Sequence, residues 1–437
     1  MRRGQPDPAW DTTATGLCWQ PLSCASALAA RSIGRRAFLG MMGGAAIGLG
    51  GEAGFVNAEE SGSSLAPTSN CITLFLAGDV MAGRGVDQIL PSPGDPRLFE
   101  PFLRSAIDYV KLTEQKAGRI PRPVEFTYVW GDALDEWARV RPDVRIVNLE
   151  TAITVSNEAD LRKGIHYRMH PKNAAVLSAA GIDCCVLANN HVLDWGQSGL
   201  TETLQTLRGL GIQTTGAGRD EAEAAAPIAI DVPYKGRVLV FSWAVASSGV
   251  TRDWSARAGY PGINFLANLL PRSVDEVVRS VRQAKRPGDI AVASFHWGGN
   301  WGFRIFEDER EFAHRIIDEA GVDVVHGHSS HHVKGIEVYR DRPIIYGSGD
   351  LVNDYEGIGG YDKYRSELAL MYFPSIDPAT GQMKSLVMTP MERRRMSLRR
   401  ASEEGEMWLR DTLNRESESL GAQVTVGLGG SLNLQWR

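Results

Sequence analysis

The sequence lacks a cysteine framework. Its five cysteines form no CxxC pair and no regularly spaced set: Cys18, Cys24, Cys71, Cys184 and Cys185. This pattern excludes a small secreted fold held together by disulfides, and it leaves no thiolate set for a structural zinc ion. A chain of 437 residues, 43% of them hydrophobic, can bury a core without such cross-links. We therefore expect the cysteines to serve packing.

An excess of charge of one sign is also missing. Lysine and arginine total 47 against 52 for aspartate and glutamate, which gives a formal net charge of −5. Nucleic-acid-binding proteins usually present a basic face, so we expect no nucleic-acid partner. An anionic substrate would have to be held by a metal ion or by a few placed arginines, because the overall field does not attract it.

A long hydrophobic run is absent as well, and the nearest approach to one lies close to the start. The pair Arg35-Arg36 precedes Phe38-Leu39 and an uncharged, glycine-rich stretch that is too mildly apolar for a membrane span. This arrangement is typical of a twin-arginine signal, which exports folded proteins. The alternative is an amino-terminal helix that merely carries two arginines. We predict a twin-arginine-type signal region over residues 1–58 and a linker over 59–70. The expected location is periplasmic or otherwise extracytoplasmic, with the twin-arginine export machinery as a partner.

After the linker, one pattern recurs: a short apolar run ends in polar residues. The runs cover residues 72–79, 144–150, 185–191, 290–296, 322–328 and 343–350. Such runs predict buried strands. Amphipathic stretches between them predict helices over residues 174–180, 199–210, 273–284 and 310–320. The alternation predicts an α/β fold of layered sheets flanked by helices, with a site at the carboxyl ends of the strands.

These elements predict a single body. Residues 71–375 contain every polar strand end and form the main domain. Residues 376–437 resemble a strand-and-helix extension of that body, and residues 94–137, rich in proline and aromatic side chains, predict an elaborated loop with short helices.

The strand ends supply ligand-type side chains. The candidate metal ligands are Asp79, Glu150, Asn190, His296, His328, His331 and His332. Each has a structural alternative when taken alone, such as a helix cap for Asp79 or a core position for His296. Their joint occurrence at strand ends, and the histidine cluster over 326–332, favour a metal site. Carboxylate, amide and imidazole groups suit one or two divalent ions such as Mn, Fe or Zn, which lower the pKa of bound water.

Five short motifs carry a family resemblance. They are Gly78-Asp79-Val80-Met81, Asn148-Leu149-Glu150-Thr151, Ala188-Asn189-Asn190-His191, Phe295-His296-Trp297-Gly298, and the run from Gly327-His328 to His332-Val333. In this order they resemble the CapA family of poly-γ-glutamate capsule-synthesis proteins, which is similar in fold to calcineurin-like metallophosphoesterases. The resemblance covers residues 72–373.

The resemblance implies roles for the acids and for the Asn-His pair. Asp79 corresponds to the first carboxylate ligand and Glu150 to the acid that bridges two ions. Asn190 resembles the amide ligand, and His191 resembles the catalytic imidazole that protonates a leaving oxygen.

The remaining histidines divide between the two ions. The resemblance places His296 and His328 on one ion, and it leaves His331 and His332 as alternatives for the other. One residue departs from the family pattern: Met81 stands where metallophosphoesterases usually have a histidine. A thioether is a poor ligand for Mn or Zn, so a one-metal or weakly two-metal centre is an alternative.

Three cations are candidates for binding an anionic substrate. Lys163 and Arg168 lie in a cationic stretch after Glu150, and Arg84 closely follows Asp79. A guanidinium can grip a carboxylate or phosphate with two hydrogen bonds. The structural alternative for the stretch is a solvated loop.

These features support three readings of the function. The first is a metal-dependent hydrolase, resembling the phosphoesterases, that acts on a phosphoester or on an anionic polymer in capsule biosynthesis. The second is a non-catalytic capsule-assembly or export factor that binds a polyanion, with other capsule-synthesis proteins as partners. The third is a metal-linked structural module of the envelope, which would not need an open asparagine-and-histidine set.

Overall fold

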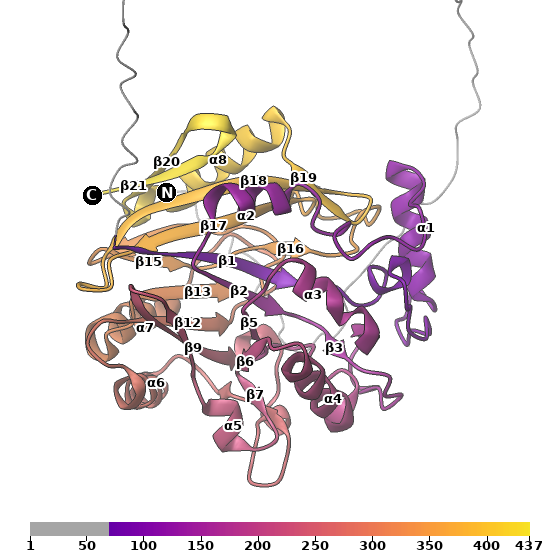
Figure 1. The fold of residues 1–437 in the computed structure, drawn as a ribbon, viewed down its shortest axis with the longest axis horizontal. Coiled ribbons are helices and arrows are strands. Elements are labelled where there is room, and N and C mark those ends of the chain that lie inside the picture. The colour runs from indigo at the N-terminus through magenta and orange to yellow at the C-terminus, as the bar shows by residue number, and fades with distance from the viewer. Residues whose placement is uncertain (1–69) are drawn as a thin grey trace, which may run out of the picture. The chain divides into compact units, whose positions relative to one another are not determined.

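The computed structural model describes residues 70–437, which form two sheets packed face to face (Figure 1). The predicted signal region and nearly all of the predicted linker lie outside these residues. The larger sheet runs in the order β20 (Ala422–Val426), β21 (Leu432–Trp436), β18 (Met383–Arg394), β17 (Leu368–Ile376), β1 (Ile72–Val80), β2 (Val144–Leu149), β5 (Cys184–Val186) and β6 (Gln213–Thr215). Beside this path, β16 (Asp350–Val352) pairs with β1 and β19 (Ser397–Arg400) pairs with β18.

The second sheet contains the other group of histidine-bearing strands. Its order is β11 (Phe265–Leu266), β9 (Gly236–Val245), β12 (Asp289–His296), β13 (Val324–His328), β15 (Arg342–Ile345) and β14 (Ile336–Tyr339), with β8 (Ile228–Val232) beside β9. Two small pairs complete the strands: β3 (Ala152–Ile153) with β4 (Arg168–Met169), and β7 (Ala217–Gly218) with β10 (Gly262–Ile263).

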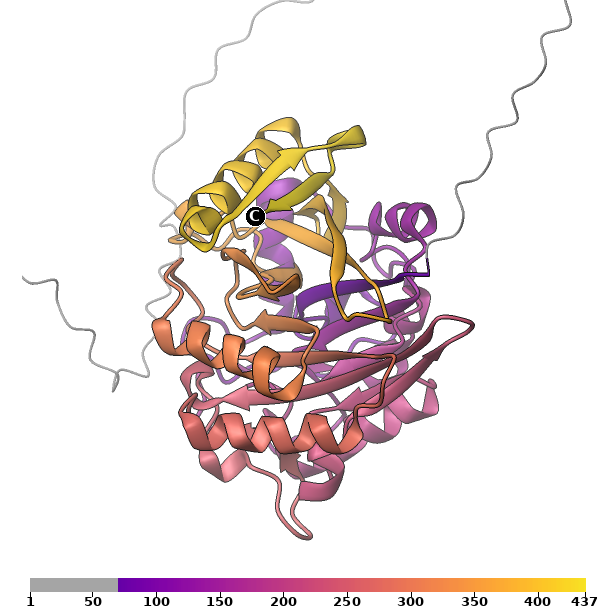
Figure 2. The same ribbon diagram turned by 90° about the vertical axis from the view of Figure 1, so that its left-hand side faces the viewer.

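The helices are α1 (Ala106–Ala117), α2 (Ala133–Val140), α3 (Ala175–Ala179), α4 (Gly196–Gly209), α5 (Glu221–Ala225), α6 (Pro271–Ala284), α7 (Glu307–Arg315) and α8 (Glu403–Ser417). Five of the described helices, α2, α3, α4, α6 and α7, pack on the outer faces of the two sheets, whereas α8 packs against the inner core. Side chains of α2, α3 and α4 share a core with the larger sheet. Side chains of α6 and α7 share another with the second sheet, on which Figures 1 and 2 show them side by side.

The predicted α/β class is confirmed, and the four predicted helices are present. Their ends are shifted by about one turn or less when the π-helical turn Ile316–Ala320 is counted with α7. Residues 376–437 supply β18 to β21 and α8, which join the larger sheet and its inner core. No helix within residues 70–437 is long and apolar enough to cross a membrane.

The inner core between the sheets turns polar toward the carboxyl ends of the strands. On β12, Ile290 and Val292 face this core, and the same face continues with Ser294 and His296 because side chains alternate with a period of two. β2 shows the same change, because its inward face passes from aliphatic residues to Asn148. On β13 the inward face passes from Val324 to His326 and His328. The two packed sheets therefore bring the polar ends of both strand sets together.

One predicted strand is divided between the two sheets. The run 343–350 was expected to form one strand, but β15 lies in the second sheet whereas β16 pairs with β1 in the larger one. Between them the chain turns at Gly349, whose φ of +72° favours glycine. This crossover places Asp350 directly beside Asp79 in the register of β1 and β16.

Gly78 permits the close approach of β1 to this crossover. A Cβ added at Gly78 would lie 1.9 Å from the backbone oxygen of Gly349. We expect Gly78→Ala to lower the free energy of unfolding by about 1–3 kcal/mol or more, because the backbone must shift to relieve the overlap. Denaturant unfolding measures this loss.

Gly209→Ala is the matched control. Gly209 ends α4, and an added Cβ there meets nothing within 4 Å. This variant should be unchanged or more stable by up to about 1 kcal/mol, since alanine favours helix more than glycine does. Equal stability of the two alanine variants would contradict the close-approach argument.

Candidate functional site

Two groups of potential metal ligands meet where the strands of both sheets end. The first group is Asp79, His296 and His328, and the second is Asp79, His331 and Asp350. Within each group the ligand atoms lie within 4.8 Å of one another, and all five residues are buried. Residues from the carboxyl ends of β1, β12 and β13, from the start of β16 and from one loop thus converge on one small volume, and Asp79 belongs to both groups.

Glu150 borders the first group but belongs to neither. Its Oε1 lies 3.9 Å from His296 Nε2 and 3.7 Å from His191 Nε2. The family resemblance gave Glu150 the bridging position between two ions. The donor distances favour Asp79 for that position, with Glu150 at the edge of the first group.

Three asparagines organise the same edge of the larger sheet. Asn148 Nδ2 donates to Asp79 Oδ1 at 2.7 Å, and Asn189 Nδ2 donates to Asn148 Oδ1 at 3.0 Å. This chain leaves Asp79 Oδ2 available to a ligand. The predicted amide ligand, Asn190, lies at the first group with its Oδ1 3.1 Å from His296 Nε2.

The histidines of the first group are held as neutral rings. His296 Nδ1 and His328 Nδ1 lie 2.9 Å apart, and His328 Nε2 lies 2.8 Å from Ser294 Oγ. Burial lowers the pKa of both rings well below the usual value. Neutral imidazole is the form that binds a metal ion, so their environment suits ligation.

The structure separates His331 from His332. His331 Nδ1 lies 2.9 Å from Asp350 Oδ1, inside the second group. Both ring nitrogens of His332 are engaged elsewhere: Nδ1 lies 2.9 Å from Val333 O, and Nε2 accepts a hydrogen bond from Gly302 N at 3.1 Å. Of the two alternatives, the geometry favours His331 as the ligand and gives His332 the task of fixing the 300–303 loop.

Asp350 is a potential metal ligand that the sequence analysis missed. It follows Gly349 at a strand end, as Asp79 follows Gly78, and that similarity was the available signal. Its Oδ2 accepts a hydrogen bond from Asn353 Nδ2 at 2.7 Å. The expectation of one continuous strand over 343–350 concealed its position beside Asp79.

The site concentrates acids in a buried volume. Burial and the neighbouring Asp350 raise the pKa of Asp79 to about 7, and burial together with Asp79 raises the pKa of Glu150 well above its usual value. Asp79 Oδ2 and Glu150 Oε2 are buried, and no N–H or O–H group among residues 70–437 donates to either of them. Buried carboxylates are normally paired or bound to metal. A divalent cation would supply the missing charge and the missing contacts, so this set of residues fits one.

The second group contains three potential ligands although residue 81 is a methionine instead of a histidine. Met81 packs in a buried cluster with Tyr167 and Tyr355, and its sulfur lies 3.7 Å from the Tyr355 hydroxyl. His331 and Asp350 supply an imidazole and a carboxylate on the other side of Asp79. Asp350 is therefore a ligand-type side chain that the expectation of a depleted site at Met81 did not include.

His191 is oriented by a carboxylate. Its Nδ1 lies 2.6 Å from Asp194 Oδ2, and Lys163 Nζ donates to Asp194 Oδ1 and to Asn190 O. Burial lowers the pKa of His191 to about 4. Although burial alone would raise the pKa of Asp194, His191 and Lys163 lower it overall. The ring is therefore neutral with Nδ1–H directed at Asp194, which leaves Nε2 as an acceptor toward the site.

The predicted substrate-binding cations are engaged within the protein. Arg84 is buried. Its Nε donates to Asp354 Oδ2 at 2.8 Å, and its Nη1 donates to Glu100 Oε1 at 3.0 Å. Arg168 donates to Ser156 O at 2.7 Å and stacks over a tryptophan ring. Both guanidiniums therefore make structural contacts inside the protein. The sequence did not predict this, because the acids and carbonyls that surround them come from distant segments.

Comparison with known proteins identifies relatives over most of the chain. The family model "Bacterial capsule synthesis protein PGA_cap" matches residues 73–355. A probable polyglutamine synthesis accessory protein of Mycobacterium tuberculosis is 49% identical over 363 residues, covering 83% of this chain and 95% of that protein. The PGA biosynthesis protein CapA of Bacillus subtilis is 24% identical over 312 residues, covering 70% and 68%. Among solved structures, GAP50 of Plasmodium aligns with a TM-score of 0.31 and 7% identity over 78% of this chain and 95% of that one, a likeness too weak to support an argument.

Proposed function

The chain belongs to the bacterial capsule synthesis protein family, as its motifs indicated, and from that premise we propose that it is a metal-dependent hydrolase of capsule biosynthesis. Its substrate class would be an anionic polymer of the poly-γ-glutamate type or a phosphoester. The single observation that carries the proposal is the pair of buried ligand groups that share Asp79.

The two ligand groups would bind metal, and His191 of the Asn-His pair would transfer a proton. Asp79, His296 and His328 would hold one divalent ion, with Glu150 beside it, and His331 with Asp350 would complete a second position. A bound divalent ion polarises a carbonyl or phosphoryl oxygen and lowers the pKa of water. The calcineurin-like metallophosphoesterase type remains part of this proposal, supported by the two face-to-face sheets and the ligand types.

His191 would move the proton. Its Nε2 can accept a proton from the attacking water and pass that proton to the leaving oxygen or nitrogen. Asp194 holds the ring in one tautomer and stabilises the imidazolium formed in between, and Lys163 keeps Asp194 ionised. The alternative is a non-catalytic polyanion-binding assembly factor, which would not need the oriented His191–Asp194 pair.

Elemental analysis with a hydrolysis screen tests the proposal. Protein purified from its own host should contain Mn, Fe or Zn and should cleave a γ-linked glutamate polymer or a phosphoester, with activity lost on chelation and restored by metal. A metal-free protein that cleaves none of these substrates after loading with each ion would contradict it.

We also propose that the protein is exported in the folded state, because Arg35-Arg36 precedes a mild apolar stretch. Replacement of both arginines by lysine should retain the precursor in the cytoplasm, as fractionation and immunoblotting would show. The control variant replaces Arg2 and Arg3 by lysine and should be exported normally. Normal export of the Arg35/Arg36 variant would exclude the twin-arginine route.

A further inference from the structure

His328 of the first ligand group presents only one of its ring nitrogens to the other ligands. Its Nδ1 lies 2.9 Å from His296 Nδ1 and 3.8 Å from Asp79 Oδ1, whereas its Nε2 lies 2.8 Å from Ser294 Oγ. A neutral imidazole has one N–H and one lone pair. Nδ1 can therefore bind a metal ion only when the ring proton is on Nε2, and the partner of Nε2 decides whether the proton is held there.

Ser294 of β12 contacts two histidine rings. Besides His328 Nε2, its Oγ lies 3.2 Å from Nδ1 of His326, a residue of β13 that belongs to neither ligand group. A serine hydroxyl has one proton, so it can donate to only one of the two rings and must accept from the other. The ring that receives the hydroxyl proton carries its own proton on its other nitrogen.

His326 determines which ring receives that proton. The ring is fully buried, and the backbone oxygen of Ala77 on β1 acts on it as an acceptor. A carbonyl oxygen can only accept, so it favours an N–H on the nitrogen that Ser294 does not contact, which is Nε2. No N–H or O–H group among residues 70–437 donates to Nε2, so nothing opposes a proton there. His326 Nδ1 is then an acceptor, and Ser294 is its donor.

We propose that Ser294 and His326 are positioning residues that fix His328 as the Nε2–H tautomer. His328 donates from Nε2 to Ser294 Oγ, Ser294 donates to His326 Nδ1, and His326 directs its own N–H toward β1. The lone pair of His328 Nδ1 is left facing Asp79 and His296, which is the form that binds a divalent ion. The inference rests on the proposed metal site and adds two residues from outside both ligand groups.

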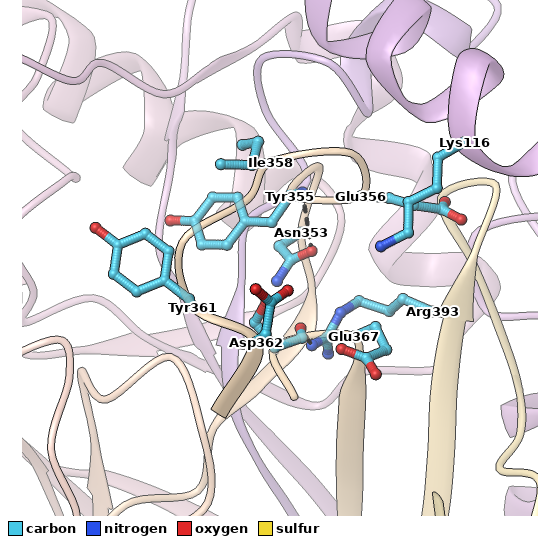
Figure 3. A pocket seen from close by; sticks show the side chains of 10 residues that line it. Lys116, Asn353, Tyr355, Glu356, Ile358, Tyr361, Asp362, Glu367 and Arg393 are labelled. Atoms are coloured by element: carbon cyan, nitrogen blue, oxygen red, sulfur yellow. Dashed lines mark hydrogen bonds between the residues drawn. The ribbon is translucent and has the colours of Figure 1, made fainter. Parts of the chain in front are cut away.

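The second ligand group is supported by separate contacts. His331 Nδ1 lies 2.9 Å from Asp350 Oδ1, and Asp350 Oδ2 accepts a hydrogen bond from Asn353. Asn353 Oδ1 in turn accepts from the backbone N–H of Tyr355, as Figure 3 shows. Because none of these contacts includes Ser294, a change at Ser294 should affect the first metal position and spare the second.

Ser294→Ala tests the pair through metal affinity, with Zn²⁺ as the probe. Without the hydroxyl, Nε2 of His328 has no acceptor, so the ring should shift toward the tautomer whose proton blocks Nδ1. Chelator competition with the full-length protein should show about tenfold to a hundredfold weaker Zn²⁺ binding at the first position only. Ser242→Ala is the matched control, because Ser242 lies beside Ser294 in the register of β9 and β12 and is also buried. No hydrogen bond joins its Oγ to any group among residues 70–437, so this variant should keep wild-type affinity.

Two substitutions of His326 examine the more distant residue. His326→Phe removes the Nδ1 acceptor, which frees the Ser294 hydroxyl to donate to His328 Nε2, and it should weaken Zn²⁺ binding at the first position at least about fivefold. His326→Asn is its control, because the amide oxygen can accept from Ser294 as Nδ1 does, and it should bind Zn²⁺ within about twofold of wild type. Circular dichroism establishes that each variant is folded. If His326→Phe does not fold, the comparison of Ser294→Ala with Ser242→Ala decides the question.

Nitrogen-15 NMR reads the position of the ring proton directly. In the metal-free protein labelled with ¹⁵N-histidine, His328 should show a protonated Nε2 and an unprotonated Nδ1, with its signals identified by their loss in His328→Gln. Ser294→Ala should move these signals toward the opposite tautomer, and Ser242→Ala should leave them in place. A role of Ser294 in packing alone would not change the tautomer.

The outcomes distinguish the positioning pair from the hydrolase. A proton on His328 Nδ1 in the metal-free wild type, or equal Zn²⁺ affinity of Ser294→Ala and Ser242→Ala, would overturn the roles of Ser294 and His326. A Ser294-dependent proton on Nε2, together with Ser294-dependent Zn²⁺ binding, would support those roles even in a protein that hydrolyses nothing, which would contradict only the hydrolase.

Discussion

Asp79→Asn is expected to remove bound metal from both ligand groups at once. Asp79 is the residue that the two groups share, and an amide is a much weaker ligand for a divalent ion than a carboxylate is. Metal content per protein chain, measured by plasma mass spectrometry after gel filtration, should fall by at least about tenfold. The buried aliphatic core does not depend on Asp79, so the variant should remain folded.

Variants that remove one group's ligand provide the contrast. His296→Ala should reduce only the first position, and Asp350→Asn or His331→Ala should reduce only the second. Each should therefore lose less metal than Asp79→Asn does. An Asp79→Asn protein that retains the wild-type metal content would show that Asp79 is not a shared ligand.

Asp79→Asn should be more stable than wild type when both proteins are free of metal. Burial and the neighbouring Asp350 raise the pKa of Asp79, so its charged form is disfavoured in the folded protein. The stability of the metal-free wild type should therefore fall as pH rises from the unfolded-state value through the raised folded-state pKa. Asp79→Asn should remove the part of this fall that is due to Asp79, while Glu150 keeps its own part, and it should gain on the order of 1–3 kcal/mol at pH 8 but little at pH 4. A stability difference that does not change with pH would contradict the electrostatic origin.

His191→Ala is expected to abolish most turnover while leaving the metal content near normal. The ring belongs to neither ligand group, and a positioned proton donor or acceptor typically contributes ~10²–10⁴-fold in rate. Turnover is measured on whichever substrate the screen identifies, with metal content determined on the same sample. His314→Ala is the control, because His314 contacts Glu337 instead of the site and should retain turnover.

Asp194→Asn examines the orientation of that ring. The amide can present its NH₂ group to Nδ1, which favours the tautomer with the proton on Nε2 and blocks acceptance there. We expect a loss of about tenfold to a hundredfold in kcat, a smaller change in KM and unchanged metal content. Equal loss of metal and turnover in His191→Ala would make His191 a ligand instead, and full activity would remove it from the mechanism.

The strand ends were predictable because their pattern is local. Apolar runs that end in Asp79, His296 and His328 can be recognised within eight residues, and alternation along a strand fixes which face each side chain occupies. The same reasoning found Asn190 and His191 after β5. Asp194 was missed, although it follows His191 by three residues. An apolar dipeptide separates the two, and nothing in that spacing indicates that the carboxylate meets the imidazole.

The sequence by itself therefore determined the fold class, the family and most residues that reach the carboxyl ends of the strands. Only the tertiary structure decided that Asp350 joins Asp79, because this depends on a chain crossing from one sheet to the other at Gly349. It also decided between His331 and His332, through the backbone groups that engage the second ring. Arg84 reads as an available cation until the buried acids around it are seen. Periodicity is a property of consecutive residues, whereas the partner of a buried charge is set by how distant segments pack.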